Sequence, residues 1–504
     1  MIAVIDFGSQ TTQLIARKIR EWGVFAEIFP FHVHPEDLKD AQGIVLSGGP
    51  ESAVQTQYPQ VRKEIWDLSV PILGICYGFQ SLALHYGAVL GKSKREYGSA
   101  KLKIFGSSPL FADIRDDTVV WMSHEDSVET LPEGFDTIAS TASIPIAGIQ
   151  SLSRKRYGIQ FHPEVFHTEA GFQIIGNFVE KIVKADKDWS LSNFIEMEIE
   201  RIKAIAGKDT VVAGISGGVD STVASVLAHQ ALGKNLHCFF VDHGLLRKNE
   251  REEVVELLSG LGIQLEVLDR KALFLDALKG VEDPEEKRKI IGKLFIDTFE
   301  ASAKKVQAKF LLQGTLYPDV IESSGGVSGL AVKIKSHHNV GGLPEKMNLK
   351  LLEPLKMLFK DEVRLIGKKL GLPDPFILRH PFPGPGLGIR IIGAVDGKKV
   401  EVLQNADAIL REELAKYDVD HQVWQGFVVL LPIRSVGVMG DQRTYQWVAA
   451  VRLVEAVDGM TARWHKMPHE VLEHISNRIT NEIIEINRVV YDITSKPPGT
   501  IEWE

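Results

Sequence analysis

The 504-residue sequence alternates twice between short β-rich runs and helical patterns. In residues 1–183, strands are predicted for IAVIDF, GIVLSGG, PILGI and YGIQFH, and helices for TTQLIARKIREWG and GFQSLALHYG. A strand–helix–strand order is typical of a parallel sheet covered by helices. We therefore predict a doubly wound, mainly parallel sheet in this part of the chain.

The second alternation follows a polar segment, KADKDWS, at residues 184–190. An amphipathic helix is predicted next, because the apolar residues of LSNFIEMEIERIKAIAG recur in steps of three and four until Gly207 ends the pattern. Beyond it, strands are predicted for TVVAGI, LHCFFVD and IQLEVLD, and helices for STVASVLAHQALG and EREEVVELLSGLG. This order predicts a second doubly wound sheet.

A segment rich in proline and glycine, LRHPFPGPGLGIR at residues 378–390, marks a further boundary, and the pattern after it is α+β. A chain of this length, 44% hydrophobic, suits about three domains. We predict a multidomain α/β protein with two doubly wound, mainly parallel-sheet domains at residues 1–188 and 189–380. Residues 381–504 then form a smaller α+β domain.

The composition indicates which kinds of partner and which cellular compartment to expect. The formal net charge is −8, from 58 Lys and Arg against 66 Asp and Glu, which argues against a nucleic-acid partner. Two cysteines cannot build a disulfide framework, so a reducing cytoplasm is expected. The start, MIAVIDFGSQ, lacks the basic region of a signal peptide, and no apolar run approaches the roughly 18 residues that span a membrane. We expect a cytoplasmic protein without a membrane partner.

The stretch VVAGISGGVDSTV predicts a phosphate-binding loop. The strand ends at Ser216, Gly217 and Gly218 allow a tight turn, and a helix is expected to begin near Asp220 and Ser221. Backbone N–H groups and the positive end of the helix dipole then favour an anion. No lysine follows the glycines as in a P-loop, so the loop suits a pyrophosphate. The alternative is an ordinary strand–helix turn in which Asp220 caps the helix.

The stretch PILGICYGFQ has the form G-x-C-x-G at a strand-to-helix junction, which is the cysteine version of a nucleophile elbow. Gly74 and Gly78 are needed because side chains at these positions would clash at so sharp a bend. Cys76 then begins a helix, whose dipole favours a thiolate. The stretch YGIQFHPEV supplies a base, His162, and a carboxylate, Glu164, that orients it. The alternative is that Cys76 is a buried core residue.

Other polar positions have less definite roles. We expect an oxyanion hole from the backbone at Gly49, in LSGGP, and at Tyr77, directly after the nucleophile. Cys238, in LHCFFVD, has neither an elbow nor a base and is predicted to be a core residue. His124, in WMSHEDSV, is expected near the Cys76 site or at a domain surface, and no catalytic role is assigned to it.

Several motifs together resemble one family. The loop SGGVDS looks like the pyrophosphate-binding loop of N-type ATP pyrophosphatases, and residues 1–183 resemble a class I glutamine amidotransferase. The motifs FVDHGLLRKNE, QGTLYPDVIES, KIKSHHNVGGLP, HPFPGPGLGIR, RSVGVMGDQRTY and KPPGTIEWE resemble the glutamine-hydrolysing GMP synthetase family, and the match runs from end to end. At His243 many members carry a smaller polar residue, which puts the contacts to adenine in doubt.

The resemblance implies an ATP-dependent ligase that converts xanthosine 5′-monophosphate (XMP) to GMP with ammonia from glutamine. It implies an adenylated XMP intermediate, the products AMP, pyrophosphate and glutamate, the cofactors ATP and Mg²⁺, and a homodimer formed by the C-terminal domain. The β- and γ-phosphates of ATP would bind the loop formed by Ser216, Gly217, Gly218, Val219, Asp220 and Ser221.

The resemblance also assigns residues of a mobile lid and of the XMP pocket, although a solvated loop surface is the alternative for the lid. The lid and adenylation residues are Asp319, Glu322, Lys333 and Lys335. The XMP-binding residues are Arg247, Gln425, Asp441, Lys496, Thr500, Ile501 and Glu502. The metal ligands stay open: Mg²⁺ is expected on the ATP phosphates, with Asp319 as a candidate ligand.

Two other functions use some of the same features. One is a pyrophosphatase-type enzyme with a different acceptor, as in NAD synthesis or transfer-RNA thiolation. The net charge and the lack of a CxxC pair disfavour thiolation, and the motifs KPPGTIEWE and HHNVGG disfavour NAD synthesis. The other is an inactive nucleotide-binding regulator, which the complete set of Cys76, His162 and Glu164 argues against.

Overall fold

The computed structural model describes the chain except for residues 54–58, 92–94, 324–348, 440–441 and 457–460. It divides into two compact units, Met1–Phe194 with 318–334 and Ile195–Tyr317 with 335–504. Each unit is described by itself below. The three-domain division at residues 188 and 380 stays a prediction.

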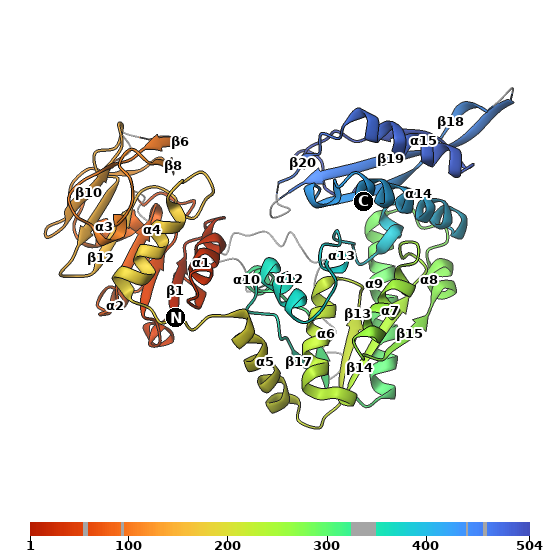
Figure 1. Cartoon of the computed structure of the whole chain (residues 1–504), viewed down its shortest axis with the longest axis horizontal. Helices are drawn as coiled ribbons and strands as arrows, with labels where there is room; N and C mark the ends of the chain where they lie inside the picture. The colour runs from red at the N-terminus through yellow and green to blue at the C-terminus, as the bar shows by residue number, and fades with distance from the viewer. Residues whose placement is uncertain (54–58, 92–94, 324–348, 440–441, 457–460) are drawn as a thin grey trace. The chain divides into compact units, whose positions relative to one another are not determined.

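The first unit is built on an eight-stranded mixed sheet (Figure 1). Five neighbouring strands are parallel, in the order β2 (Ala26–Pro30), β1 (Ile2–Asp6), β3 (Gly43–Leu46), β4 (Ile72–Ile75) and β12 (Arg156–Ile159). Three antiparallel strands continue the sheet, in the order β11 (Gly148–Ser151), β10 (Asp136–Ser140) and β7 (Lys103–Ile104). The mainly parallel sheet predicted for this part is confirmed.

Helices and small ribbons complete the first unit. The helices are α1 (Thr12–Glu21), α2 (Lys63–Trp66), α3 (Tyr77–His85), α4 (Gly171–Asn177) and a π-helix at Phe178–Val183. The two ribbons pair β5 (Leu90–Gly91) with β9 (Ser127–Val128), and β6 (Glu96–Lys101) with β8 (Val119–His124). Every residue of β1, β3 and β4 is buried, as expected for central parallel strands covered on both faces.

The second unit contains an all-parallel sheet in the order β15 (Leu265–Asp269), β14 (Leu236–Asp242), β13 (Val211–Ile215), β16 (Phe310–Leu312) and β17 (Lys350–Leu352). Among the described residues from Leu191 to Ile377, the helices are α5 (Leu191–Ala206), α6 (Val219–Leu232), α7 (Glu250–Gly260), α8 (Lys271–Ala277), α9 (Pro284–Lys305), α10 (Tyr317–Ser323), α12 (Lys360–Lys369) and α13 (Asp374–Ile377); of these, α10 belongs to the first unit from Pro318 on. The doubly wound sheet predicted here is confirmed.

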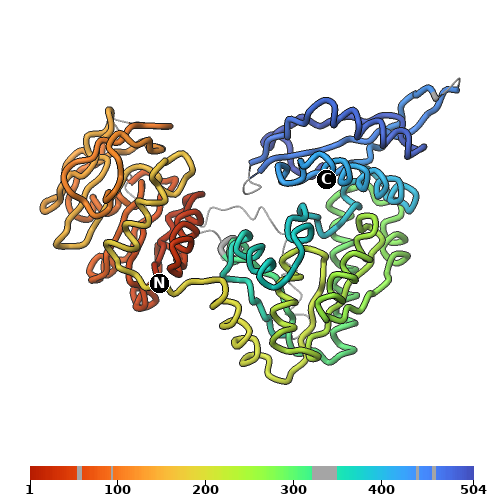
Figure 2. Tube along the Cα trace, viewed as in Figure 1, coloured from red at the N-terminus to blue at the C-terminus, as the bar shows by residue number. Residues whose placement is uncertain are grey.

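The C-terminal part is α+β, as predicted. Its strands are β18 (Gln425–Met439), β19 (Gln442–Glu455), β20 (Arg463–Trp464) and β21 (Ile486–Tyr491), and its helices are α14 (Gly397–Lys416) and α15 (His469–Glu482). Strands β18 and β19 form a long antiparallel hairpin, and β21 pairs with β19 in parallel. The tube in Figure 2 shows this hairpin running beyond the two helices as a narrow extension.

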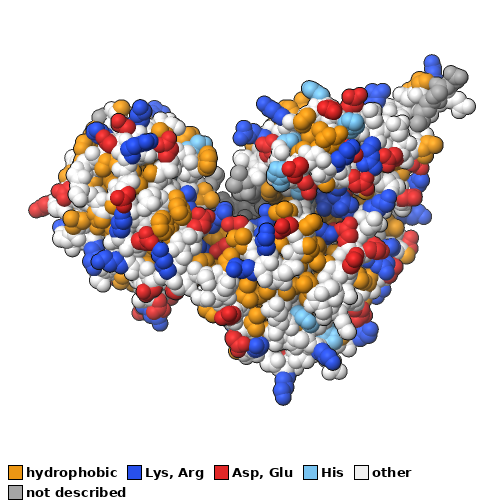
Figure 3. All heavy atoms as spheres, viewed as in Figure 1, with side chains coloured by type: hydrophobic (Ala, Val, Ile, Leu, Met, Phe, Trp, Pro, Cys, Tyr) orange, Lys and Arg blue, Asp and Glu red, His pale blue; other side chains and the backbone are white. Residues whose placement is uncertain are grey.

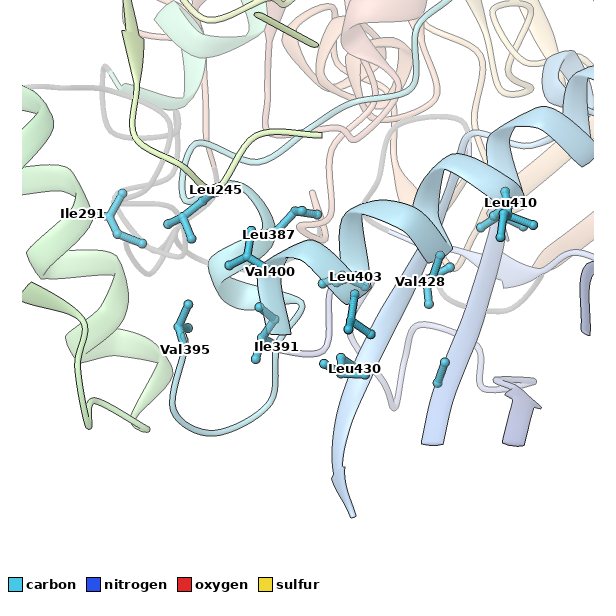
Figure 4. Packing of buried hydrophobic residues seen from close by; sticks show 14 of the residues in the cluster. Leu245, Ile291, Leu387, Ile391, Val395, Val400, Leu403, Leu410, Val428 and Leu430 are labelled. Carbon is cyan, nitrogen blue, oxygen red and sulfur yellow. The ribbon is translucent and has the colours of Figure 1, made fainter. Parts of the chain in front are cut away.

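One hydrophobic core joins the parallel sheet of the second unit to the C-terminal sheet. Val212 of β13, Ile291 of α9 and Val428 of β18 belong to the same cluster of buried side chains. Figure 4 shows Leu387 and Ile391, from the segment before α14, packed within it. The predicted second and third domains therefore share a core.

The surface carries side chains of both charges, as the nearly balanced composition leads us to expect. On the face in Figure 3, Lys and Arg side chains are interspersed with Asp and Glu side chains. Among the residues that the structure describes, no helix is both long and apolar enough to cross a membrane.

Candidate active site

Cys76 lies at the turn between β4 and α3 with φ 51° and ψ −107°. A positive φ at a residue with a side chain costs about 1–3 kcal/mol and is typical of functional turns. A Cβ on Gly74 would lie 2.6 Å from the carbonyl oxygen of Gly78, and a Cβ on Gly78 would lie 2.4 Å from the carbonyl oxygen of Leu46. The elbow and its need for both glycines are confirmed.

His162 and Glu164 form a buried pair beside this cysteine. Nδ1 of His162 lies 2.7 Å from Oε1 of Glu164, so Nδ1–H donates to the carboxylate and Nε2 is left to exchange a proton with the thiol. Burial lowers the pKa of His162, but the Cys76 thiolate and the Glu164 carboxylate outweigh burial and raise it above its ordinary value. The site therefore favours a protonated imidazole at His162.

The predicted oxyanion positions lie against this pair. A Cβ on Gly49 would lie 3.3 Å from Cγ of Tyr77, and one on Gly48 would lie 3.2 Å from Cε1 of His162. Both glycines follow β3 at the carboxyl edge of the parallel sheet, where loops of such sheets form sites. The structure thus brings Gly49 and Tyr77 together near Cys76.

Two residues of this site were not predicted from the sequence. Thr11 donates from Oγ1 to Oε1 of Glu164 at 2.7 Å, which adds a second donor to the buried carboxylate. Gln160 donates from Nε2 to Sγ of Cys76 at 3.8 Å. A signal for Gln160 was present, because it precedes His162 by two residues and alternate residues of an extended chain face the same side.

The structure also places His124, which had no assigned role, and Cys238, which was predicted to be a core residue. His124 is buried at the end of β8, with Nδ1 2.9 Å from the carbonyl oxygen of Asp126, and burial lowers its pKa more than this hydrogen bond raises it. Cys238 is buried in β14, and burial raises its pKa to about 12. The prediction that Cys238 is a core residue is confirmed.

The predicted phosphate loop connects β13 to α6. Gly217 has φ 77°, which favours glycine, and Gly218 precedes the first helical residue. Oγ of Ser216 lies 3.2 Å from Oγ of Ser221, and Oγ of Ser221 donates to the carbonyl of Gly218 at 3.1 Å. The loop therefore presents two hydroxyls at the N-terminus of a 14-residue helix.

Asp220 does not cap this helix. Gly218 occupies the cap position, and the carboxylate of Asp220 instead accepts a hydrogen bond from Nζ of Lys360, in α12, at 2.6 Å. The capping role of Asp220 in the alternative is therefore wrong, and phosphate binding by the loop stays a prediction. Mg²⁺ in nucleotide sites uses one or two carboxylates with substrate phosphates, and Asp220 beside the loop hydroxyls fits that donor set. Within the described residues, no cluster of three or more His, Cys, Asp or Glu could hold a metal by itself.

The C-terminal segment is docked on the rest of the second unit. Glu502 accepts hydrogen bonds from Nη2 of the fully buried Arg390 at 2.8 Å and from Nε2 of Gln425 at 2.7 Å. The carbonyls of Thr500 and Ile501 accept from the guanidinium of Arg452, at 2.7 and 3.1 Å. Four of the predicted XMP residues therefore meet in one place.

Further charged side chains anchor the same segment. Glu504 is paired with Lys287, which is fully buried in α9, and its main-chain oxygen accepts from Arg288. Trp503 donates from Nε1 to Asp492 at 2.9 Å. These contacts fix the segment on the α9 and β19 sides.

Arg247 is linked to this group through an aromatic ring. Its guanidinium lies 4.6 Å from the centre of the Phe382 ring, and that of Arg390 lies 5.2 Å from the same centre. Burial lowers the pKa of Arg247 more than the nearby Asp407 carboxylate raises it. Arg247 also lines a cavity of about 570 Å³ together with His380.

The remaining predicted residues are placed only in part. Asp319 lies in α10, and the backbone of Lys496 forms an antiparallel bridge with Ala462. Lys333, Lys335, Asp441 and the side chain of Glu322 lie outside the described part of the chain.

His243 is a buried base that directly follows the last residue of β14. The residue is 5% exposed, and Nδ1 accepts from the backbone N–H of Leu245 at 3.1 Å. Burial lowers its pKa to about 4, and Asp242 only partly opposes this effect. His243 is therefore neutral at pH 7.

Acid should destabilise the protein through His243. The unfolded side chain takes up a proton near pH 6.5 and the folded one near pH 4, so the free energy of unfolding falls as the pH drops between these values, by up to about 3 kcal/mol. In His243→Asn the amide oxygen can still accept from Leu245, and the fall should be smaller in urea unfolding at pH 7 to 4.5. His237→Asn, in the preceding strand β14, is the matched control. Equal pH dependence in His243→Asn and wild type would contradict this account.

Three family models match the sequence. They are glutamine amidotransferase class-I over residues 3–182, NAD synthase over 190–290 and GMP synthase C terminal domain over 412–503. A glutamine-hydrolyzing GMP synthase of Aquifex aeolicus (strain VF5) is 55% identical over 507 residues, which cover 100% of this chain and 99% of the relative. The same enzyme of Thermosipho africanus (strain TCF52B) is 54% identical over 511 residues, with 100% and 99% covered.

A solved structure is also similar to part of the chain. It is that of a putative GMP synthase component from Thermoplasma acidophilum. It is 34% identical, covers 36% of this chain and 93% of its own, and has a TM-score of 0.33.

Proposed function

Because the chain belongs to the glutamine-hydrolysing GMP synthase family, we propose that it makes GMP from XMP through an adenylated XMP intermediate. The oxygen on C2 of XMP attacks the α-phosphorus of ATP, and pyrophosphate leaves. Ammonia from glutamine then attacks C2, and AMP leaves with that oxygen. The other products are pyrophosphate and glutamate. Family membership disfavours the alternatives of NAD synthesis, transfer-RNA thiolation and an inactive regulator.

Glutamine is hydrolysed at Cys76. Its thiolate attacks the side-chain amide of glutamine, and His162 gives its proton to the leaving ammonia. Glu164 holds the imidazole with Nε2 toward the sulfur, which the 2.7 Å hydrogen bond to Nδ1 supports. Backbone N–H groups at Gly49 and Tyr77 stabilise the oxyanion. His162 then takes a proton from water, which releases glutamate from the thioester.

ATP is bound by the loop of the second unit. Ser216, Gly217, Gly218, Val219, Asp220 and Ser221 hold the β- and γ-phosphates. Mg²⁺, when bound with ATP, neutralises charge on the leaving pyrophosphate, and Asp220 would hold it, with Asp319 as a second candidate. Lys360 already neutralises Asp220, so it can turn to a phosphate when another cation takes its place. Asp319, Glu322, Lys333 and Lys335 are proposed to act in closure and adenylation.

XMP is bound by the C-terminal segment and its surroundings. The proposed contacts are Arg247, Gln425, Asp441, Lys496, Thr500, Ile501 and Glu502. The joint placement of Gln425, Glu502 and the Arg452-bound carbonyls supports this pocket. Each of the three proposed domains then has one role. Residues 1–188 release ammonia, residues 189–380 activate XMP with ATP, and residues 381–504 bind XMP.

The observation that carries the proposal is the strained Cys76 elbow beside the His162–Glu164 pair, on one chain with a phosphate loop. The test uses XMP labelled with oxygen-18 at C2. Transfer of the label to AMP, with AMP and GMP formed in equal amounts, is the expected result. Label in pyrophosphate or in water would contradict the adenylate.

We also propose that the C-terminal part joins two copies of the chain. Ile433, Val436, Val438 and Tyr445, in β18 and β19, are more than half exposed, and apolar patches of this kind mark interfaces. Sedimentation should report twice the chain mass, and a single-chain mass would contradict the dimer. A nucleophilic thiol needs a reducing compartment, which supports a cytoplasmic location.

A further inference from the structure

The sulfur of Cys76 lies between two neutral groups with opposite hydrogen-bonding roles. Sγ is 3.7 Å from the carbonyl oxygen of Ser123, which can only accept, and 3.8 Å from Nε2 of Gln160, which can only donate. The carbonyl can accept a hydrogen bond from the protonated thiol. The amide N–H can donate a hydrogen bond to the thiolate.

The amide of Gln160 is held in the orientation that points its nitrogen at the sulfur. The residue is fully buried, and its Oε1 accepts from Nε2 of Gln80 at 3.4 Å. Nε2 of Gln80 also donates to the carbonyl of Asp126 at 2.8 Å, which fixes Gln80 itself. Because the oxygen of Gln160 is used by Gln80, its N–H group is the one left to face Cys76.

A donor in this position acts on the reacting atom. When the sulfur is ionised, a buried N–H that points at it is a charge-assisted donor, which is stronger than a hydrogen bond between neutral groups. When the sulfur is protonated, its S–H can turn to Ser123 instead. Loss of the N–H should therefore weaken only the ionised form.

We propose that Gln160 is a catalytic residue whose amide N–H stabilises the Cys76 thiolate and fixes the direction in which it attacks. The proposal rests on the proposed function, in which Cys76 is the nucleophile. His162 supplies the charge of the ion pair, and Gln160 supplies a neutral donor that stays in place when the proton moves from His162 to the leaving ammonia.

Other charged or titratable groups surround this site. A useful variant of Gln160 must not alter their charges. They are His162, Glu164, His124, Asp126, Tyr97 and Glu125. Gln160→Met removes the donor and adds no charge, so it leaves these groups as they are. Gln160→Glu replaces the donor by a carboxylate and adds a charge that opposes the thiolate.

The test measures the alkylation of Cys76 by iodoacetamide between pH 5 and 9 in the full chain. In Gln160→Met the rate at pH 7 should fall about tenfold, and the midpoint of the pH profile should rise by about one unit, because a donor to a charged group is removed. Gln160→Glu should shift the midpoint further. Gln150→Met is the matched control, since Gln150 is buried in β11, the strand paired with β12 that precedes Gln160, and donates to the carbonyl of Ser107 instead. Its profile should match wild type.

The outcomes separate this proposal from the proposed function. A thermal unfolding profile of Gln160→Met that matches wild type shows that the variant is folded; if it does not fold, Gln160→Glu provides the comparison. A profile that does not move in a folded Gln160 variant, or that moves equally in Gln150→Met, overturns the role of Gln160. Glutamine hydrolysis that survives Cys76→Ala would instead overturn the proposed function.

Discussion

A Cys76→Ala variant is expected to lose glutamine-dependent GMP formation by about 10⁴-fold or more, because no other group at the elbow can form the thioester. With ammonium as the nitrogen source, the same variant should make GMP near the wild-type rate, since the proposed ATP and XMP sites do not involve Cys76. Alanine carries a Cβ as cysteine does, so the turn at φ 51° should persist. The measurement is GMP formation with each nitrogen source.

The second cysteine provides the control for this comparison. Cys238→Ala removes a buried thiol from β14 and should keep both activities, with some loss of stability from the smaller side chain. If Cys76→Ala lost the ammonium-dependent reaction too, two separate sites would be the wrong description of the enzyme.

An Asp220→Ala variant should lose both the glutamine-dependent and the ammonium-dependent reactions, by about 10³-fold. The substitution removes the carboxylate that fits a cation at the phosphate loop and leaves Lys360 without its partner at 2.6 Å. The binding of pyrophosphate to the purified chain should weaken in parallel. The Cys76 site should still react with iodoacetamide at the wild-type rate, because its own residues are unchanged.

Asp209→Asn is the matched control for the loss of a carboxylate. Asp209 also pairs with a lysine, Lys309 at 2.7 Å, but this pair lies on the surface away from the loop sequence. Exposed pairs contribute little to stability, so Asp209→Asn should keep both reactions. Retention of ammonium-dependent activity by Asp220→Ala would exclude a role for the carboxylate in binding ATP.

The central parallel strands could be predicted from the sequence because they are buried on both faces. The run PILGI is apolar throughout and TVVAGI is apolar after Thr210, and they become β4 and β13 with ends within one residue of those predicted. The small strands between residues 90 and 128 could not be predicted. Strand β6, with the sequence EYGSAK, alternates between half-buried and exposed positions, but its side chains show no apolar period.

The residues of the candidate sites also differ in whether a local sequence pattern predicts them. The elbow was predictable because its G-x-C-x-G pattern is local and the clash that requires Gly74 arises with Gly78 itself, whereas Gly78 is also required by the carbonyl oxygen of Leu46 on the neighbouring strand β3. The pair of Asp220 with Lys360 joins positions 140 residues apart, and that of Glu502 with Arg390 joins positions 112 apart. No local pattern marks such partners. Only the fold brings them together.

The core shared by Val212, Ile291 and Val428 has a thermodynamic consequence. A single core ties the parallel sheet and the C-terminal sheet into one cooperative unit of unfolding, although the sequence divides them at residue 380. A substitution that loosens the C-terminal sheet therefore lowers the population of chains with an intact phosphate loop, without touching that loop. An amino-acid substitution in one part of this unit can therefore change the activity of the other part.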